Sequence, residues 1–75
     1  MSSKLPRATA TKILRALQRD GWAIVRQRGS HVLLEHPTKP GLVVVPNHRG
    51  ELRTGTLKSI LDDAGLISEE LRRLL

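Results

Sequence analysis

The first periodic segment of the chain, residues 9–21, has the pattern of an amphipathic helix. Apolar positions at i, i+3, i+4 and i+7 form one helix face, and here they are Ala10, Ile13, Leu14 and Leu17. Thr9 precedes this run and is suited to cap a helix N-terminus, and Gly21 follows it where a helix-ending glycine is expected. The sequence therefore predicts a helix between these two residues.

Three segments with strand character follow, at residues 22–28, 31–36 and 42–45. Gly29 lies in a tight turn between the first two, and the two prolines within residues 37–41 cannot continue a ladder. These breaks predict a three-stranded antiparallel sheet in which successive strands pair. Alternation puts Trp22, Ile24, Arg26 and Arg28 on one side of the first strand, and in the second it separates Val32 and Leu34 from His31, Leu33 and Glu35.

The last third of the chain predicts two more helices. The one-face spacing returns in residues 56–64, with Leu57, Ile60, Leu61 and Ala64. Gly65 follows as a helix-ending glycine. Ser68 is expected to cap a short C-terminal helix with Glu69 and Glu70 in its first turn, where the helix dipole favours acidic residues.

The order of these elements predicts an α+β fold: a helix, a three-stranded antiparallel sheet, a second helix and a short C-terminal helix. Residues 1–75 form a single domain, because a chain of this length supports only one core. We expect residues 1–8 to be loosely ordered. Two helices can cover one face of such a sheet and leave the other face partly open.

The charge of the chain is positive and unevenly distributed. The net charge is +6, and residues 1–58 hold eleven of the 13 Lys and Arg residues but only three of the seven Asp and Glu residues. A basic body of this kind favours a polyanionic partner. Trp22 is the only aromatic residue, which argues against a platform on which single-stranded bases stack.

The composition also excludes several classes of protein. The chain has no cysteine, so it has neither disulfides nor thiolate metal sites. Residues 42–46 form the longest apolar run, which is far below the ~20 residues of a membrane span. No signal-peptide pattern precedes the first helix. We expect a cytoplasmic protein without a metal or other cofactor.

Histidine is the side chain that titrates near neutral pH, and the chain has His31, His36 and His48. Ser30 does not form a catalytic pair with His31, because adjacent residues of a strand point to opposite faces. His31 follows a tight turn beside Arg26 and Arg28, where arginines can hold a phosphodiester while the imidazole moves a proton. The competing interpretation is an ordinary polar residue at an exposed strand start.

Other candidate residues have two interpretations as well. His48 lies in a polar loop, where it either contacts phosphate or ties the loop to the sheet, whereas His36 is expected at a solvated strand end. Trp22 is expected in the core rather than on a base-stacking surface. Lys12, Arg15 and Arg19 form the solvated side of the first helix, and a surface that follows a nucleic-acid backbone is the alternative.

Several segments, taken in order, resemble the HicA toxin family, which is also described as YcfA-like. They are Asp20-Gly21-Trp22, Arg26-Gln27-Arg28-Gly29-Ser30-His31, Val45-Pro46-Asn47-His48-Arg49-Gly50-Glu51-Leu52, Gly55-Thr56-Leu57-Lys58-Ser59-Ile60-Leu61 and Ala64-Gly65-Leu66. The specific element is Gly-Ser-His followed by an apolar strand, joined to Pro-x-His and the Gly-Thr-Leu helix. The resemblance runs from about Thr9 to Leu75, and Trp22 stands where the family usually has Phe or Tyr.

The resemblance implies a double-stranded-RNA-binding-domain-like fold and a toxin endoribonuclease that cleaves mRNA, with His31 as the catalytic general acid or base. A metal is not expected, and the residues expected to contact RNA are Arg26, Arg28, Gly29, Ser30, His48, Arg49 and Lys12. A HicB-like antitoxin is the implied partner, and operator DNA would be contacted only through the complex with it. The alternative is a non-catalytic double-stranded-RNA-binding module of the same fold, and a DNA-binding partner in a repressor complex is a third interpretation.

Overall fold

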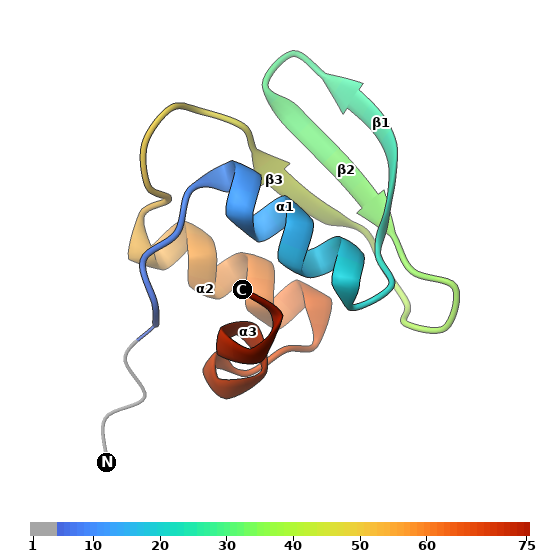
Figure 1. Cartoon of the computed structure of the whole chain (residues 1–75). Helices are drawn as coiled ribbons and strands as arrows, with labels where there is room; N and C mark the ends of the chain where they lie inside the picture. Colours follow the sequence, from blue (N-terminus) through green and yellow to red (C-terminus); the bar gives the residue numbers. More distant parts are fainter. Residues whose placement is uncertain (1–4) are drawn as a thin grey trace.

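The computed structural model describes residues 5–75 and confirms the predicted α+β order (Figure 1). Its elements are α1 (Ala10–Arg19), β1 (Ala23–Arg28), β2 (His31–Glu35), β3 (Val43–Pro46), α2 (Thr54–Ala64) and α3 (Ser68–Leu74). The strands form one antiparallel sheet in the order β1-β2-β3, as the sequence predicts.

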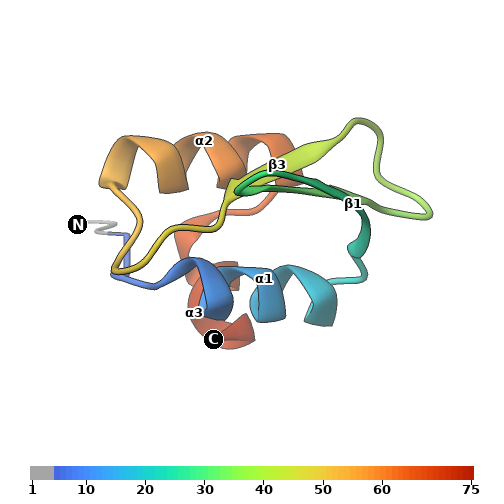
Figure 2. The same ribbon diagram turned by 90° about the horizontal axis from the view of Figure 1, so that it is seen from above.

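The helices and the sheet form two layers. Figure 2 shows α1 and α3 together on one side and the sheet with α2 on the other. Val32 and Leu34 of β2 are buried, and so are Val43 and Val45 of β3, whereas the residues that alternate with them are more exposed. The sheet therefore has a buried inner face toward α1 and an outer face that no helix of the described chain covers.

The segment that precedes α1 contributes to the core. Ala8 is buried, and its carbonyl accepts a hydrogen bond of 2.9 Å from the backbone N–H of Leu52. Leu5 packs against the same core from its edge. The expectation of loose order falls in part on residues 1–4, which lie outside the described residues.

Of the helix ends for which the sequence offers a local signal, all but one follow it. The Thr9 hydroxyl accepts a hydrogen bond of 3.3 Å from Lys12 N–H, so Thr9 caps α1 as predicted. Gly65 ends α2 in the left-handed conformation, with φ of 68°. The prediction that Ser68 caps α3 is wrong, because Ile67 occupies the N-cap position and the carboxylate of Glu70 accepts its backbone N–H at 3.0 Å.

Several other boundaries differ from the prediction by one or two residues. Helix α2 begins at Thr54 rather than near residue 56, β1 begins at Ala23 rather than at residue 22, β2 ends at Glu35 rather than at residue 36, and β3 runs from Val43 to Pro46 rather than over residues 42–45. Proline fits the end of β3 because it has no N–H to donate to a ladder. These shifts leave the order of the elements unchanged.

Strand β1 departs from strict alternation. Ile24 pairs with Leu34, but the register shifts before Arg26, so Val25 is an extra residue in a β-bulge. Directly paired residues point to the same side of a sheet, so Ile24 lies on the inner face with Leu34. The prediction that Ile24 shares a side with Arg26 and Arg28 is therefore wrong, although both arginines do lie together on the outer face.

The imidazole of His36 holds the junction between α1 and the sheet. Its Nδ1 accepts the backbone N–H groups of Thr38 and Lys39 at 3.1 Å each, and its Nε2 donates to the Asp20 carbonyl at 2.8 Å. The ring meets the buried indole of Trp22 edge-on, with 5.2 Å between centroids. The expectation of a solvated His36 is wrong, whereas the expectation of a core Trp22 is confirmed.

Gly21→Ala is expected to lower the free energy of unfolding by about 1–3 kcal/mol, because Gly21 has a φ of 105° and an added Cβ would lie 2.7 Å from His36 Nε2. Urea unfolding followed by circular dichroism measures this loss. Gly55→Ala is the matched control, since Gly55 lies in α2 at ordinary φ with open space around it, and it should gain up to about 1 kcal/mol. Equal stability of Gly21→Ala and the wild type would contradict the expectation.

Candidate active site on the open sheet face

His31 lies at the centre of one end of the sheet. It is the first residue of β2, and the strand register places Arg28 opposite it on β1 and Pro46 opposite it on β3. The side chain of the following residue, Val32, is buried on the inner face, so the imidazole of His31 points to solvent on the outer face. The ring is therefore accessible from solvent without any rearrangement of the fold.

The turn before His31 lets a ligand come close to the backbone, because Gly29 has no side chain. Gly29 adopts a φ of 58°, which a residue with a side chain rarely takes, and its carbonyl accepts a hydrogen bond of 3.2 Å from the Gln27 side chain. The carbonyl of Ser30 accepts the backbone N–H of Asn47 at 2.6 Å. This last bond fixes the start of the loop between β3 and α2 against the β1–β2 turn.

That hydrogen bond brings two parts of the predicted site together. His48 and Arg49 follow Asn47 directly in the chain, and both are exposed. The sequence predicts His48 and Arg49 as site residues but does not indicate the role of Asn47. This role cannot be predicted from neighbouring residues, because it depends on the end of β3 lying opposite the start of β2.

The outer face around His31 is positively charged. Arg26 and Arg28 lie on it beside one another along β1, and both are exposed. Within residues 5–75, the ion pairs join Arg7 to Glu51 and Lys39 to Asp20, so neither arginine of β1 is neutralised by an acidic side chain. Two unpaired guanidinium groups near an exposed imidazole form an arrangement suited to a phosphodiester.

Lys12 is the predicted RNA contact that the fold separates from the others. It is exposed on α1, which covers the inner face of the sheet, whereas His31 lies on the outer face. Lys12 lines a shallow hollow together with Arg7, Arg15, Arg19 and Leu75. The structure therefore divides the predicted contacts between two surfaces.

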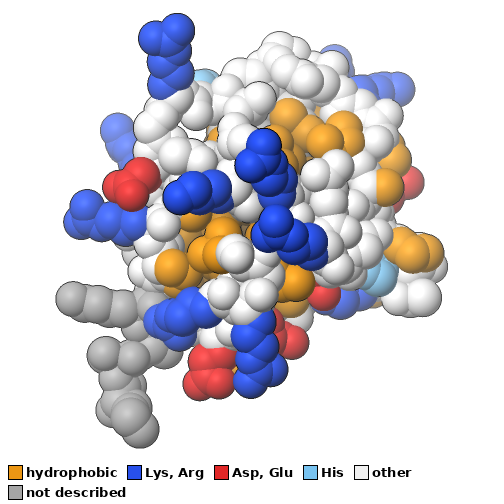
Figure 3. Space-filling model, in the orientation of Figure 1, with side chains coloured by type: hydrophobic (Ala, Val, Ile, Leu, Met, Phe, Trp, Pro, Cys, Tyr) orange, Lys and Arg blue, Asp and Glu red, His pale blue; other side chains and the backbone are white. Residues whose placement is uncertain are grey.

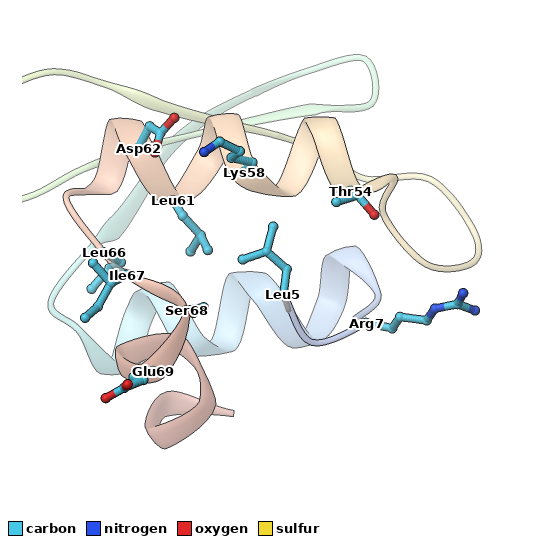
Figure 4. A pocket seen from close by; sticks show the side chains of 10 residues that line it. All are labelled: Leu5, Arg7, Thr54, Lys58, Leu61, Asp62, Leu66, Ile67, Ser68 and Glu69. Atoms are coloured by element: carbon cyan, nitrogen blue, oxygen red, sulfur yellow. The ribbon is translucent and has the colours of Figure 1, made fainter. Parts of the chain in front are cut away.

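A hollow of about 790 Å³ lies elsewhere, between α2, α3 and the segment that precedes α1 (Figure 4). It is lined by Leu5, Arg7, Thr54, Lys58, Leu61, Asp62, Leu66, Ile67, Ser68 and Glu69. None of these is a predicted site residue, and the hollow holds no histidine. In residues 5–75, no three His, Asp or Glu side chains gather as a set of metal ligands.

Fold and surface together define a small basic α+β domain that offers an exposed histidine among arginines on an open sheet face. The family model for the HicA toxin of bacterial toxin–antitoxin systems matches residues 10–66, and the chain belongs to this family. Its role is that of a toxin, and membership implies an antitoxin partner. No curated protein was found to match the chain. Among the described helices, none has both the length and the apolar character needed to cross a bilayer.

Proposed function

We propose that this toxin is an endoribonuclease that cleaves mRNA and that His31 is its general acid or base. The observation that supports this function best is the position of His31: an exposed imidazole opposite Arg28, at a glycine turn, on the uncovered face of the sheet. RNA supplies its own nucleophile, the 2′-hydroxyl beside the scissile phosphate. The protein then has to transfer a proton and stabilise negative charge.

The proposed reaction is an intramolecular transesterification. The 2′-oxygen forms a bond to phosphorus, the bond from phosphorus to the 5′-oxygen breaks, and the 2′-hydroxyl proton leaves as the departing 5′-oxygen gains one. His31 transfers the proton at one of these two oxygens, and solvent serves the other. General acid–base help of this kind contributes about 10²–10⁴-fold.

The residues around His31 then hold the phosphate. Arg28 lies directly opposite the imidazole, and Arg26 follows on the same face. The loop that carries His48 and Arg49 is fixed beside the turn. These cations stabilise the charge that develops on the phosphorane, while Gly29 and Ser30 allow close approach of the backbone.

The direct test is RNA cleavage by the purified chain with and without the imidazole of His31. The partner in the cell is proposed to be a HicB-like antitoxin, with operator DNA bound only by the complex of the two proteins. Such a toxin acts on cytoplasmic mRNA. Binding of RNA without cleavage would instead identify a double-stranded-RNA-binding module of the same fold.

Cleavage is expected to continue at an unchanged rate in EDTA, because attack by the 2′-hydroxyl needs no metal-bound water. The 5′ fragment should end in a 2′,3′-cyclic phosphate or a 3′-phosphate. Gel analysis of end-labelled RNA, before and after treatment with a phosphatase, identifies these ends. Activity that is lost with the chelator and restored by a divalent cation would rule out the mechanism, and a 3′-hydroxyl end would do the same.

A further inference from the structure

The exposed side of α1 carries a second basic surface, formed by Arg7, Lys12, Arg15 and Arg19 and called the α1 surface below. These four residues line a hollow of about 370 Å³ together with Leu75, and no acidic side chain lines it. Figure 3, which views the molecule from the α1 side, shows Lys and Arg side chains across this face and acidic side chains near its margins. The face is therefore a concentration of positive charge.

The α1 surface and His31 lie on opposite sides of the domain. Ile13 and Leu17 of α1 are fully buried in the core beneath the sheet, so the cations of α1 point away from it. His31 lies on the outer face, beyond the sheet from α1. A single phosphate at His31 cannot contact both surfaces.

The cations of the α1 surface have few partners within the described chain. Arg7 lies 3.8 Å from Glu51 in an exposed ion pair, which contributes little to stability. A guanidinium N–H of Arg19 donates to the Leu74 carbonyl and so ties α3 to α1. Among the described residues, no side chain pairs with the charge of Lys12 or Arg15. These two charges lie one helical turn apart and repel one another, so their pairing does not stabilise the helix.

A single loop connects the two surfaces. It starts at Asn47, bonded to Ser30 beside His31, and returns to α1 where Glu51 bridges with Thr9, the N-cap of α1. The exposed cations Arg49 and Arg53 lie on or at the end of this loop, next to the exposed imidazole of His48. A polyanion that leaves His31 along this loop therefore passes Arg49 and Arg53, with the carboxylate of Glu51 beside Arg7, before it reaches Lys12.

We propose that the α1 surface is a second contact for the RNA backbone, reached only by substrates long enough to pass from His31 around the end of the domain. The inference rests on the proposed function, because it takes the strand cleaved at His31 as the strand that is held. The smallest extent of the molecule is 17 Å. At 3.4 Å per phosphate of a duplex strand, a path of this length spans at least about five phosphates.

The lining of the surface favours nucleic acid over a protein partner. Protein interfaces are centred on aromatic side chains as well as arginines, whereas this hollow offers four long cations, one leucine and no aromatic ring. The side chains of Lys and Arg contact phosphates without reading bases. The α1 surface should therefore add affinity for any long RNA and leave the choice of cleavage site to the face of His31.

The test measures RNA binding by the full chain carrying His31→Ala, so that the RNA stays intact. Fluorescence anisotropy compares two single-stranded RNAs with the same central sequence, of roughly 3 and 25 nucleotides, the first with fewer phosphates than the path above and the second with more. Adding Lys12→Gln and Arg15→Gln removes two phosphate contacts. The slope of log K against log salt for the long RNA should then become shallower by about 1.4, and the preference for the long RNA should decrease.

The matched control adds Lys58→Gln and Arg73→Gln, two exposed helical cations that do not line the α1 surface, and it should keep the slope of its parent. An equal change of this slope in both variants would show that only the net charge of the protein matters, and it would overturn the proposal. Equal losses for the two RNAs would overturn it as well, and so would unchanged RNA binding with weakened antitoxin binding. These results do not depend on cleavage, so a failure of the proposed ribonuclease activity is recognised separately.

Discussion

Replacing His31 with alanine is expected to lower the rate of RNA cleavage by about 10²–10⁴-fold and to abolish growth arrest, because the imidazole is the proposed proton-transfer group. The fold should be retained. His31 is exposed, and within the described residues no hydrogen bond holds its ring. Substitutions at such surface positions usually change stability by less than about 0.5 kcal/mol. Single-turnover cleavage of a labelled RNA, with a melting curve of the same sample, measures both quantities.

His48→Ala is the control for this experiment. It removes another exposed histidine from the same end of the sheet, but one proposed to contact phosphate rather than to move a proton. His48→Ala should mainly raise KM, whereas His31→Ala should mainly lower kcat. Cleavage by His31→Ala at the wild-type rate would mean that the imidazole is not catalytic, and absence of cleavage by the wild type would favour the RNA-binding module.

Trp22→Ala should destabilise the domain by about 3–5 kcal/mol, because it removes the largest side chain of a small core and leaves a cavity. A domain of this size loses roughly 4–8 °C in melting temperature per kcal/mol, so Tm should fall by at least about 12 °C. The substitution also removes the ring that His36 contacts at the junction of α1 and β1. Thermal unfolding followed by far-ultraviolet circular dichroism measures the shift.

Trp22→Phe distinguishes the contribution of ring volume to stability from that of the buried indole N–H. The indole Nε1 is buried and has no hydrogen-bond partner among residues 5–75. Phenylalanine keeps an aromatic ring and buries no N–H group, so part of the loss from the smaller ring should be offset. A Tm close to that of Trp22→Ala would show that the junction depends on the indole itself.

The parts of the fold that the sequence predicts correctly depend on neighbouring residues. The cap at Thr9 and the glycine end of α2 are decided within a few positions, and so is the alternation of β2. The predictions that are wrong concern residues whose positions depend on contacts with distant segments of the chain. The bulge at Val25 becomes visible only when β1 is aligned with β2, and the ring of His36 is held by Asp20 and Trp22 from another part of the chain.

The residues of the candidate site also fall into a group that can be predicted from neighbouring residues and a group that cannot. Arg28 and His31 flank a two-residue turn, so their pairing across the hairpin follows from the sequence. The contribution of Asn47 does not, because it requires the end of β3 to lie beside Ser30. The separation of Lys12 also depends on packing, since periodicity reveals which side of α1 is polar but not which face of the sheet the helix covers.

The bulge in β1 has a consequence for solubility. β1 and β3 are the outer strands of the sheet, and β3 packs against α2. β1 leaves its edge open and exposes the apolar side chains of Ile24 and Val25, a combination that invites pairing with a second copy and aggregation. The bulge at Val25 bends this edge, and a neighbouring copy would also bring Arg26 and Arg28 against identical charges. The same two arginines that are proposed to hold RNA would thus also disfavour the joining of two sheets.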